Sequence, residues 1–111
     1  MVYPVTSPLL DACVLAVISR GDTYGYSLTQ EIRRWLDISE STLYPILRRL
    51  CKEGCLTVYD RAYQGRNRRY YAITNVGEAM LAGYREAWRD HRANVEAVLM
   101  DTTEGGTRND Q

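Results

Sequence analysis

The sequence lacks the residues that most metal sites and nucleophilic active sites require. Its 111 residues include a single histidine, His91, and only three cysteines, which form no CxxC pair. A zinc site needs about four such ligands, so no metal is expected. The serines lack the glycine pattern of a nucleophile elbow, no glycine-rich loop is placed to hold phosphate, and the carboxylates do not cluster. The sequence therefore argues against an enzyme, and no cofactor is expected.

Long apolar runs are also absent. The longest continuous run lies near residues 12–18, which is far short of the about 20 residues that a membrane-spanning helix requires. No charged and cleavable leader pattern precedes this run. We therefore expect a soluble, cytoplasmic protein with no membrane partner.

Lysine is scarce, whereas arginine is plentiful and unevenly placed. Of the 14 basic residues only Lys52 is a lysine, and the formal net charge is zero. Between Arg33 and Arg69, however, basic residues outnumber acidic ones. The planar arginine side chain suits phosphate oxygens and guanine edges. This distribution indicates a nucleic-acid partner, although a solvated charged face is an alternative explanation.

The three cysteines favour a structural role. Cys13 falls in an apolar helical segment, Cys51 follows Leu50, and Cys55 lies a few residues further on. Cysteines in such surroundings behave as small apolar residues, so we expect buried and unreactive thiols. Redox sensing is the alternative.

Residues 39–56 are predicted to contain a DNA-recognition helix, with Ser39 as its N-cap and Gly54 just past its end. At about 100° per residue, one face of this helix is apolar. Its members are Leu43, Ile46, Leu47 and Leu50. The opposite side offers hydroxyl groups and positive charge, and its members are the predicted DNA contacts Ser41, Thr42, Tyr44, Arg48 and Lys52. An ordinary amphipathic surface helix is the alternative.

Two further helices and a hairpin surround this segment. The first helix is predicted to start with Ser7 as N-cap and to stop at Gly21, and the second to span 24–36. Only three residues, 37–39, separate the second helix from the recognition helix, which is the spacing of a helix-turn-helix. Residues 56–73 then predict a β-hairpin with a turn within 62–67. Its basic residues are the predicted wing contacts Arg66, Arg68 and Arg69, and a purely structural hairpin is the alternative.

The last predicted helix spans 75–100 and is longer than a small head domain needs. Large side chains recur on one of its faces at spacings of about 3.5 residues, as in helices that pair. These residues are Tyr84, Trp88, His91, Val95 and Val98. They predict a homodimer interface, and the alternative is a face that folds back on its own head.

Together these segments predict a mainly α protein with a small β-hairpin, in the α+β class. The domains expected are an N-terminal arm (1–6), a winged helix-turn-helix DNA-binding domain (7–74), a long C-terminal dimerisation helix (75–100) and a disordered tail (101–111). The tail is expected to be disordered because it contains no apolar residue and includes a pair of glycines.

The chain resembles the PadR family of bacterial transcriptional regulators over residues 9–99. The resemblance rests on Gly21 followed by Tyr-Gly-Tyr at 24–26, Ser-Thr-Leu-Tyr-Pro at 41–45, Glu-Gly at 53–54, and Tyr-Tyr-Ala-Ile-Thr at 70–74 with Gly77. It implies a winged helix-turn-helix homodimer whose last helix packs against the partner, including the partner's first helix. That packing adds Leu9 and Cys13 to the expected dimer interface.

The single C-terminal helix is similar to the smaller PadR subfamily, which includes multidrug-sensing repressors. In the drug binders, tryptophans from the last helices of two subunits sandwich planar aromatic ligands. Trp88 matches this tryptophan in position, so the resemblance implies Trp88 as a ligand-binding residue and a planar aromatic effector as a partner. Arg92 stands where those proteins carry an acidic residue, so a preference for cationic ligands is not implied. A core tryptophan without a ligand is the alternative.

The expected function is therefore transcription regulation by a ligand-responsive repressor that binds double-stranded DNA as a homodimer. Two recognition helices would enter successive major grooves of a palindromic operator, about 34 Å apart. The alternative is a winged-helix module that binds another protein and has no sequence-specific contact with DNA.

Overall fold

The computed structural model describes residues 5–101, which form four helices and a three-stranded antiparallel sheet. The predicted α+β class and the long C-terminal helix are confirmed. The helices are α1 (Ser7–Ser19), α2 (Gly25–Arg33), α3 (Glu40–Lys52) and α4 (Asn75–Leu99). The strands are β1 (Thr23–Tyr24), β2 (Leu56–Tyr63) and β3 (Arg66–Ile73). The predicted arm and tail lie mostly on residues 1–4 and 102–111, outside the described residues.

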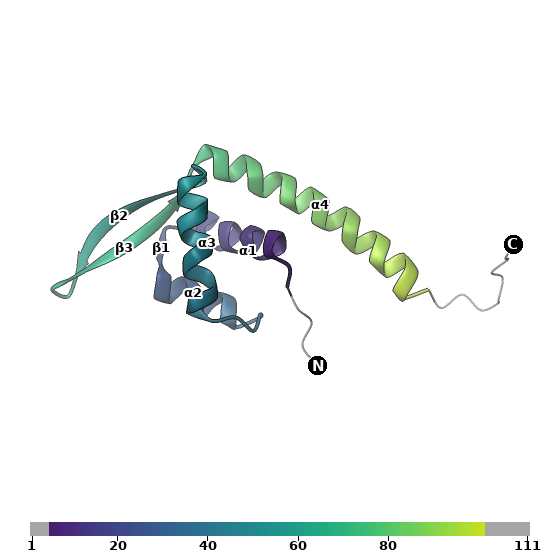
Figure 1. The fold of residues 1–111 in the computed structure, drawn as a ribbon, viewed down its shortest axis with the longest axis horizontal. Coiled ribbons are helices and arrows are strands. Elements are labelled where there is room, and N and C mark those ends of the chain that lie inside the picture. Colours follow the sequence, from purple (N-terminus) through teal and green to yellow (C-terminus); the bar gives the residue numbers. More distant parts are fainter. Residues whose placement is uncertain (1–4, 102–111) are drawn as a thin grey trace, which may run out of the picture.

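Helices α1, α2 and α3 form a head, and two projections leave this head in opposite directions (Figure 1). One projection is the hairpin of β2 and β3, called the wing below, and the other is the outer part of α4. The head encloses the hydrophobic core, to which all four helices contribute. Its fully buried members include Val14, Leu15, Ile18, Leu28, Leu43, Leu47, Leu50 and Leu81.

Only the beginning of α4 packs on the head. Leu81 is buried in the core, and Tyr84, one turn later, is half-buried against it. From Arg85 onward every residue of the helix is exposed in this chain, and its outer part extends away from the head (Figure 1). The alternative that the predicted interface folds back on its own head therefore applies at most to Tyr84 and Trp88, and not to His91, Val95 or Val98.

The sheet has the strand order β1-β3-β2. In the wing Tyr63 pairs with Arg66, and the two residues between them, Gln64 and Gly65, have φ angles of 51° and 78°. Two successive positive φ angles are typical of a type I′ hairpin turn. The turn lies within 62–67, as predicted, and the strands remain paired up to its two residues.

Strand β1 was not predicted. Thr23 and Tyr24 pair with Tyr71 and Tyr70 of β3, whereas the sequence pattern predicted that Tyr24 starts the second helix. That helix runs from Gly25 to Arg33 rather than over 24–36. After Arg33 the chain continues in a tighter, 3₁₀-type turn, in which the Trp35 amide donates to the carbonyl of Ile32, three residues earlier, at 3.0 Å. A two-residue strand carries too little sequence pattern to be detected.

The ends of the other helices follow the glycine and capping signals closely. The N-cap of α1 is Thr6, one residue before the predicted Ser7. Helix α3 starts after Ser39 and ends before Gly54, as predicted, and Gly54 has a φ of 81°. Amides of Gly54 and Cys55 donate to carbonyls of the last turn of α3, which is a Schellman ending.

One corner of the molecule joins the wing, α3 and α4. The Thr74 hydroxyl donates to the Gly54 carbonyl at 2.6 Å and accepts from the Gly77 amide at 3.1 Å, which caps α4. A Cβ on Gly77 would lie 2.3 Å from the Cys55 carbonyl oxygen. Real Cβ atoms do not approach a backbone atom so closely, so only glycine fits at this position without a shift of the backbone.

Candidate nucleic-acid interface

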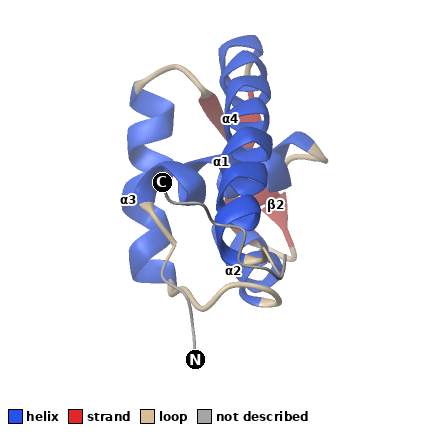
Figure 2. Ribbon diagram, turned by 90° about the vertical axis from the view of Figure 1, so that its right-hand side faces the viewer, coloured by secondary structure: helices blue, strands red, loops and turns tan. Residues whose placement is uncertain are grey.

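Helix α3 has one buried face and one exposed face. Leu43, Ile46, Leu47 and Leu50 are buried in the core, as the periodicity predicted. On the other side the predicted contacts Ser41, Thr42, Tyr44, Arg48 and Lys52 are all exposed. Figure 2 shows α3 at one flank of the molecule, set apart from α4.

The hydroxyl groups at the start of α3 form a small cluster. The Ser39 Oγ lies 2.9 Å from the Ser41 Oγ and 3.2 Å from the Thr42 Oγ1. Ser39 occupies the predicted N-cap position, but its side chain accepts no capping hydrogen bond from the backbone. Hydroxyl groups can both donate and accept, so this cluster suits phosphate oxygens as well as base edges.

The hydroxyl end of the Tyr44 ring lies against Gly25, the first residue of α2. A Cβ built on Gly25 would be 2.7 Å from the Tyr44 hydroxyl oxygen, so the absence of a side chain at Gly25 makes room for the ring. The hydroxyl donates weakly to Glu40 Oε2, 3.4 Å away. Burial raises the pKa of Tyr44, and the charge of Glu40 adds to the rise. The hydroxyl is therefore protonated at neutral pH and available as a donor.

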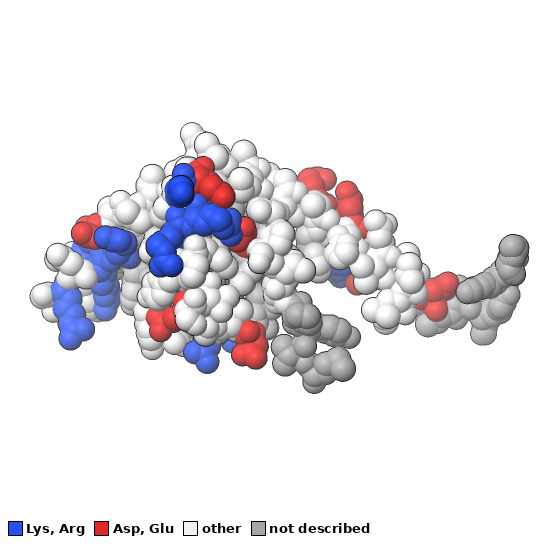
Figure 3. Space-filling view, viewed as in Figure 1, with Lys and Arg blue, Asp and Glu red and all other residues white. Residues whose placement is uncertain are grey.

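An open pocket of ≈ 580 Å³ separates α3 from the wing. Residues of α2, α3 and the wing line it, among them Tyr26, Tyr44, Arg48, Asn67 and Arg69. Figure 3 shows the basic side chains gathered over the wing and over α3, whereas the charged side chains visible along α4 in this view are mostly acidic. The pocket and its rim form a concave, basic and hydrogen-bonding surface.

The three predicted wing contacts differ in their surroundings. Arg66 is exposed beside the turn. Arg69 lies 3.9 Å from Asp60 in an exposed ion pair, which is weak in water. Arg68 is half-buried, and its guanidinium group lies between the rings of Tyr24 and Tyr63. Among the residues that the structure describes, Arg48, Lys52 and Arg66 make no ion pair with a carboxylate.

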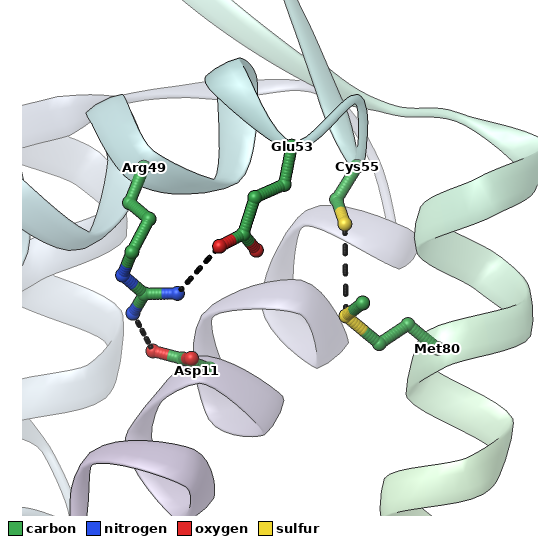
Figure 4. A network of polar contacts seen from close by, with 5 residues as sticks. All are labelled: Asp11, Arg49, Glu53, Cys55 and Met80. Carbon is green, nitrogen blue, oxygen red and sulfur yellow. Dashed lines mark hydrogen bonds and ion pairs between the residues drawn. The ribbon is translucent and has the colours of Figure 1, made fainter.

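Arg49, next to Arg48 on α3, has a different role, which the sequence analysis missed. It donates to Asp11 of α1 at 2.7 Å and lies 3.6 Å from Glu53 (Figure 4). Asp11 is only 5% exposed. The hydrogen bond to Asp11 raises the pKa of Arg49, so the guanidinium group stays charged. The one sequence signal was a lone carboxylate inside an apolar helix, because a buried charge needs a partner.

A second surface lies on the other side of the head. An apolar groove of ≈ 390 Å³ runs between α1 and α4. It brings together four residues of the predicted dimer and ligand sites that are distant in sequence, namely Leu9, Cys13, Tyr84 and Trp88. The other predicted interface residues, His91, Val95 and Val98, lie beyond this groove and are exposed, Val98 to 84%.

The surroundings of the three thiols make them unreactive. Cys55 is buried and its Sγ lies 3.6 Å from Met80 Sδ (Figure 4), while Cys13 and Cys51 are half-buried. Burial raises the pKa of each of these thiols, which keeps them protonated and weakly nucleophilic. Within residues 5–101 no group of histidine, cysteine and carboxylate side chains is arranged to hold a metal ion.

Comparison with known proteins identifies the family. The sequence profile described as Transcriptional regulator PadR-like family matches residues 14–83. Transcriptional regulator Rv3488 of Mycobacterium tuberculosis is 37% identical over 87 residues, which cover 78% of this chain and 81% of that protein. The chain belongs to the PadR-like family of transcriptional regulators.

Solved structures of other proteins share the architecture. The crystal structure of smu.1704 from Streptococcus mutans UA159 superposes with a TM-score of 0.85 at 37% identity, covering 96% of this chain and 100% of that chain. Bacillus subtilis PadR, solved in complex with operator DNA, superposes with a TM-score of 0.63 at 19% identity. That match covers 92% of this chain and 53% of the Bacillus protein, and at this identity it shows the shared fold alone.

Membership of the PadR-like family confirms two expectations from the sequence. The protein is a transcriptional regulator with a winged helix-turn-helix, and it is not an enzyme. In the described part of this PadR-like chain, no helix combines the length and apolar character that crossing a bilayer requires.

Proposed function

We propose that this PadR-like regulator is a ligand-responsive repressor that binds a palindromic operator as a homodimer. The observation that best supports DNA binding is the two-sided character of α3. Its apolar side fills the core, while Ser41, Thr42, Tyr44, Arg48 and Lys52 stand exposed beside a basic wing. The fold itself is compatible with this role, since Bacillus subtilis PadR has been solved with operator DNA.

The proposed contacts divide by position along α3 and the wing. Ser41, Thr42 and Tyr44 lie in its first turns and would reach base edges and phosphates. Arg48 and Lys52 lie further along the same side and would neutralise phosphates, as would Arg66 and Arg69 of the wing. The pocket between α3 and the wing would then receive the DNA backbone.

Dimerisation through α4 is proposed because that helix exposes apolar side chains beyond the head. Trp88, Val95 and Val98 are 44%, 41% and 84% exposed, and they occupy one face at helical spacing. A second copy would cover this face and the apolar groove beside Leu9 and Cys13. Two joined copies present two α3 helices, and a symmetric protein recognises a symmetric site.

The effector is proposed to bind in the groove between α1 and α4, against Trp88 and beneath the second copy. The groove is apolar and is lined by the aromatic rings of Tyr84 and Trp88, which suits a planar aromatic molecule. Occupation of the operator would block transcription. An effector would relieve this block only if it binds one spacing of the two heads more tightly than another.

The first test measures binding of a 30-base-pair duplex by fluorescence anisotropy at several salt concentrations. About six phosphate contacts give a slope near −5 in a plot of log affinity against log salt. Arg48→Ala should reduce the slope by about 1.8, because each of the two subunits loses one phosphate contact. Arg89→Ala, an exposed arginine on α4, is the matched control and should leave the slope unchanged. A wild-type slope near zero would contradict DNA binding.

The palindrome has a separate test. Selection from random duplexes should return an inverted repeat with half-sites about 10 base pairs apart, centre to centre. A selected site without two-fold symmetry would contradict binding as a symmetric dimer, even if the affinity for DNA is high.

The effector site is tested by tryptophan fluorescence. Trp35, which is 80% exposed, is first replaced by phenylalanine so that Trp88 alone reports. Planar aromatic compounds should quench this variant in a saturable manner and should weaken DNA binding. A Trp88→Phe variant that retains Trp35 is the control for collisional quenching. Equal quenching of the two variants would remove Trp88 from the effector site.

A further inference from the structure

One face of the wing consists almost entirely of tyrosine and arginine. Side chains alternate between the two faces of a strand, and the register of β2 with β3 places six such residues on the same face. They are Tyr59, Arg61, Tyr63, Arg66, Arg68 and Tyr70. Tyr24 joins this face because β1 pairs it with Tyr70.

Arg68 lies at the centre of this face. Its guanidinium carbon is 3.9 Å from the ring centroid of Tyr63 and 4.4 Å from that of Tyr24. Both distances are well within the about 6 Å over which a cation and an aromatic ring attract each other. Tyr63 belongs to the end of the wing and Tyr24 belongs to β1, so Arg68 joins the wing to the head.

The aromatic contacts continue toward the base of the wing. Tyr24 meets Tyr70 edge to face at 5.4 Å, and Tyr70 stacks on Tyr59 at 5.6 Å. The Tyr59 hydroxyl then donates to Asp22 at 2.7 Å, just before β1. We call the set Tyr63, Arg68, Tyr24, Tyr70 and Tyr59 the tyrosine–arginine stack. It runs from the end of the wing to the segment in front of α2.

The wing needs such a brace because little else supports it. Beyond Leu56, every residue of β2 is exposed, and an isolated hairpin is only marginally stable in water. Strand β1 supports only the pair Tyr70 and Tyr71 of β3. The direction of the outer wing relative to α3 therefore depends on contacts that reach past β1, and the stack provides them.

We infer that Arg68 is a positioning residue, which holds the wing at a fixed angle to α3 through the rings of Tyr24 and Tyr63. Arg66 and Arg69 then meet DNA at a set distance from α3. Arg68 itself contributes orientation rather than a phosphate contact. This inference rests on the proposed function for its effect on DNA, but its structural part can be measured without DNA.

The DNA-free measurement compares the wing amides by 15N relaxation. Arg68→Ala and Tyr24→Leu should both increase the mobility of residues 60–68 relative to α3, and Tyr24→Phe, which keeps the ring, should not. Arg66→Ala is the matched control for loss of one wing charge and should leave the mobility unchanged. Unchanged mobility in Arg68→Ala would overturn the inference, whatever the DNA assays show.

The DNA measurement uses the same duplex and a double-mutant cycle. Arg68→Ala and Tyr24→Leu should each weaken binding by about 10-fold, and the double variant should also lose about 10-fold, because both changes release the same brace. Additive losses of about 100-fold, or normal binding by Tyr24→Leu, would instead identify Arg68 as a phosphate contact and refute the inference. If the DNA affinity of the wild type did not depend on salt, the proposed function would be refuted, but the mobility result would still hold.

Discussion

The wing and the outer part of α4 project in opposite directions, and they differ in the contacts that their side chains make within the chain. In the wing, Arg68 lies between two tyrosines and Tyr59 bonds Asp22, so contacts within the chain hold it in place. In outer α4, the polar residues form pairs along the helix, such as Arg92 with Glu96, but the large apolar residues have no comparable cover. The difference indicates that the wing is ready to meet a polar ligand in water, whereas outer α4 needs another apolar surface.

The largest expected effect comes from placing charge on outer α4. The double change Val95→Asp and Val98→Asp should convert a dimer to a monomer in sedimentation velocity, because two charges would be buried at the interface. DNA affinity should fall by about 100-fold or more, since binding of a second head would no longer be intramolecular. Ala93→Asp, on the opposite side of the same helix, should remain dimeric. A dimer that survives the double change would place the interface elsewhere.

A smaller effect is expected at the corner where both projections begin. Gly77→Ala puts a Cβ against the Cys55 carbonyl, and overpacking of this kind costs about 1–3 kcal/mol. The free energy of unfolding should fall by about 2 kcal/mol in urea titrations. Gly83→Ala is the control on the same helix, where a Cβ would meet nothing within 4 Å, and it should stabilise by about 0.5–1 kcal/mol. Equal stabilities of the two variants would mean that the corner adapts freely.

The next effect concerns the ion pair between Asp11 of α1 and Arg49 of α3. Asp11→Asn removes a charge-assisted bond from Arg49, and we expect a loss of about 1–2 kcal/mol, allowing for the partial exposure of Arg49. Glu96→Gln breaks the exposed pair with Arg92 and should cost about 0.3 kcal/mol. Similar losses in the two variants would show that the burial of Asp11 adds nothing to the strength of its ion pair.

The smallest effect is expected at Gly25. Gly25→Ala should push the Tyr44 ring away from α2, because the new Cβ would meet its hydroxyl end. Since Tyr44 is partly exposed and can rotate, stability should change little, while DNA affinity should fall several-fold. Gly21→Ala, where a Cβ meets nothing within 4 Å, is the control. Normal DNA affinity in Gly25→Ala would remove the orientation of Tyr44 from the proposed mechanism.

Local patterns made most of the fold predictable. The spacing of Leu43, Ile46, Leu47 and Leu50 identified the buried face of α3, and Gly54 marked its end. The last helix was predicted to start at residue 75, where α4 begins. These signals act within a few residues, so one sequence is enough to detect them. The exposed side of α3 followed from the same periodicity, although its contacts with DNA remain predictions.

Pairings between distant residues were not predictable. Arg48 and Arg49 are neighbours of the same type, yet one faces solvent and the other bonds Asp11, which lies 38 positions earlier. The sequence did not distinguish Arg68 from the other basic residues of the wing. Its contact with Tyr24 depends on the pairing of β1 with β3, which forms only in the folded protein. Such roles depend on which elements meet, and no local pattern records that.

The hydroxyl of Thr74 has a mechanical consequence. It bonds both the end of α3, through the Gly54 carbonyl, and the start of α4, through the Gly77 amide. Through this hydroxyl the direction of α4 is coupled to that of α3. If two copies are joined along α4, a change of a few degrees in the angle at which they cross becomes a change in the separation of their α3 helices, magnified by the length of the lever arm.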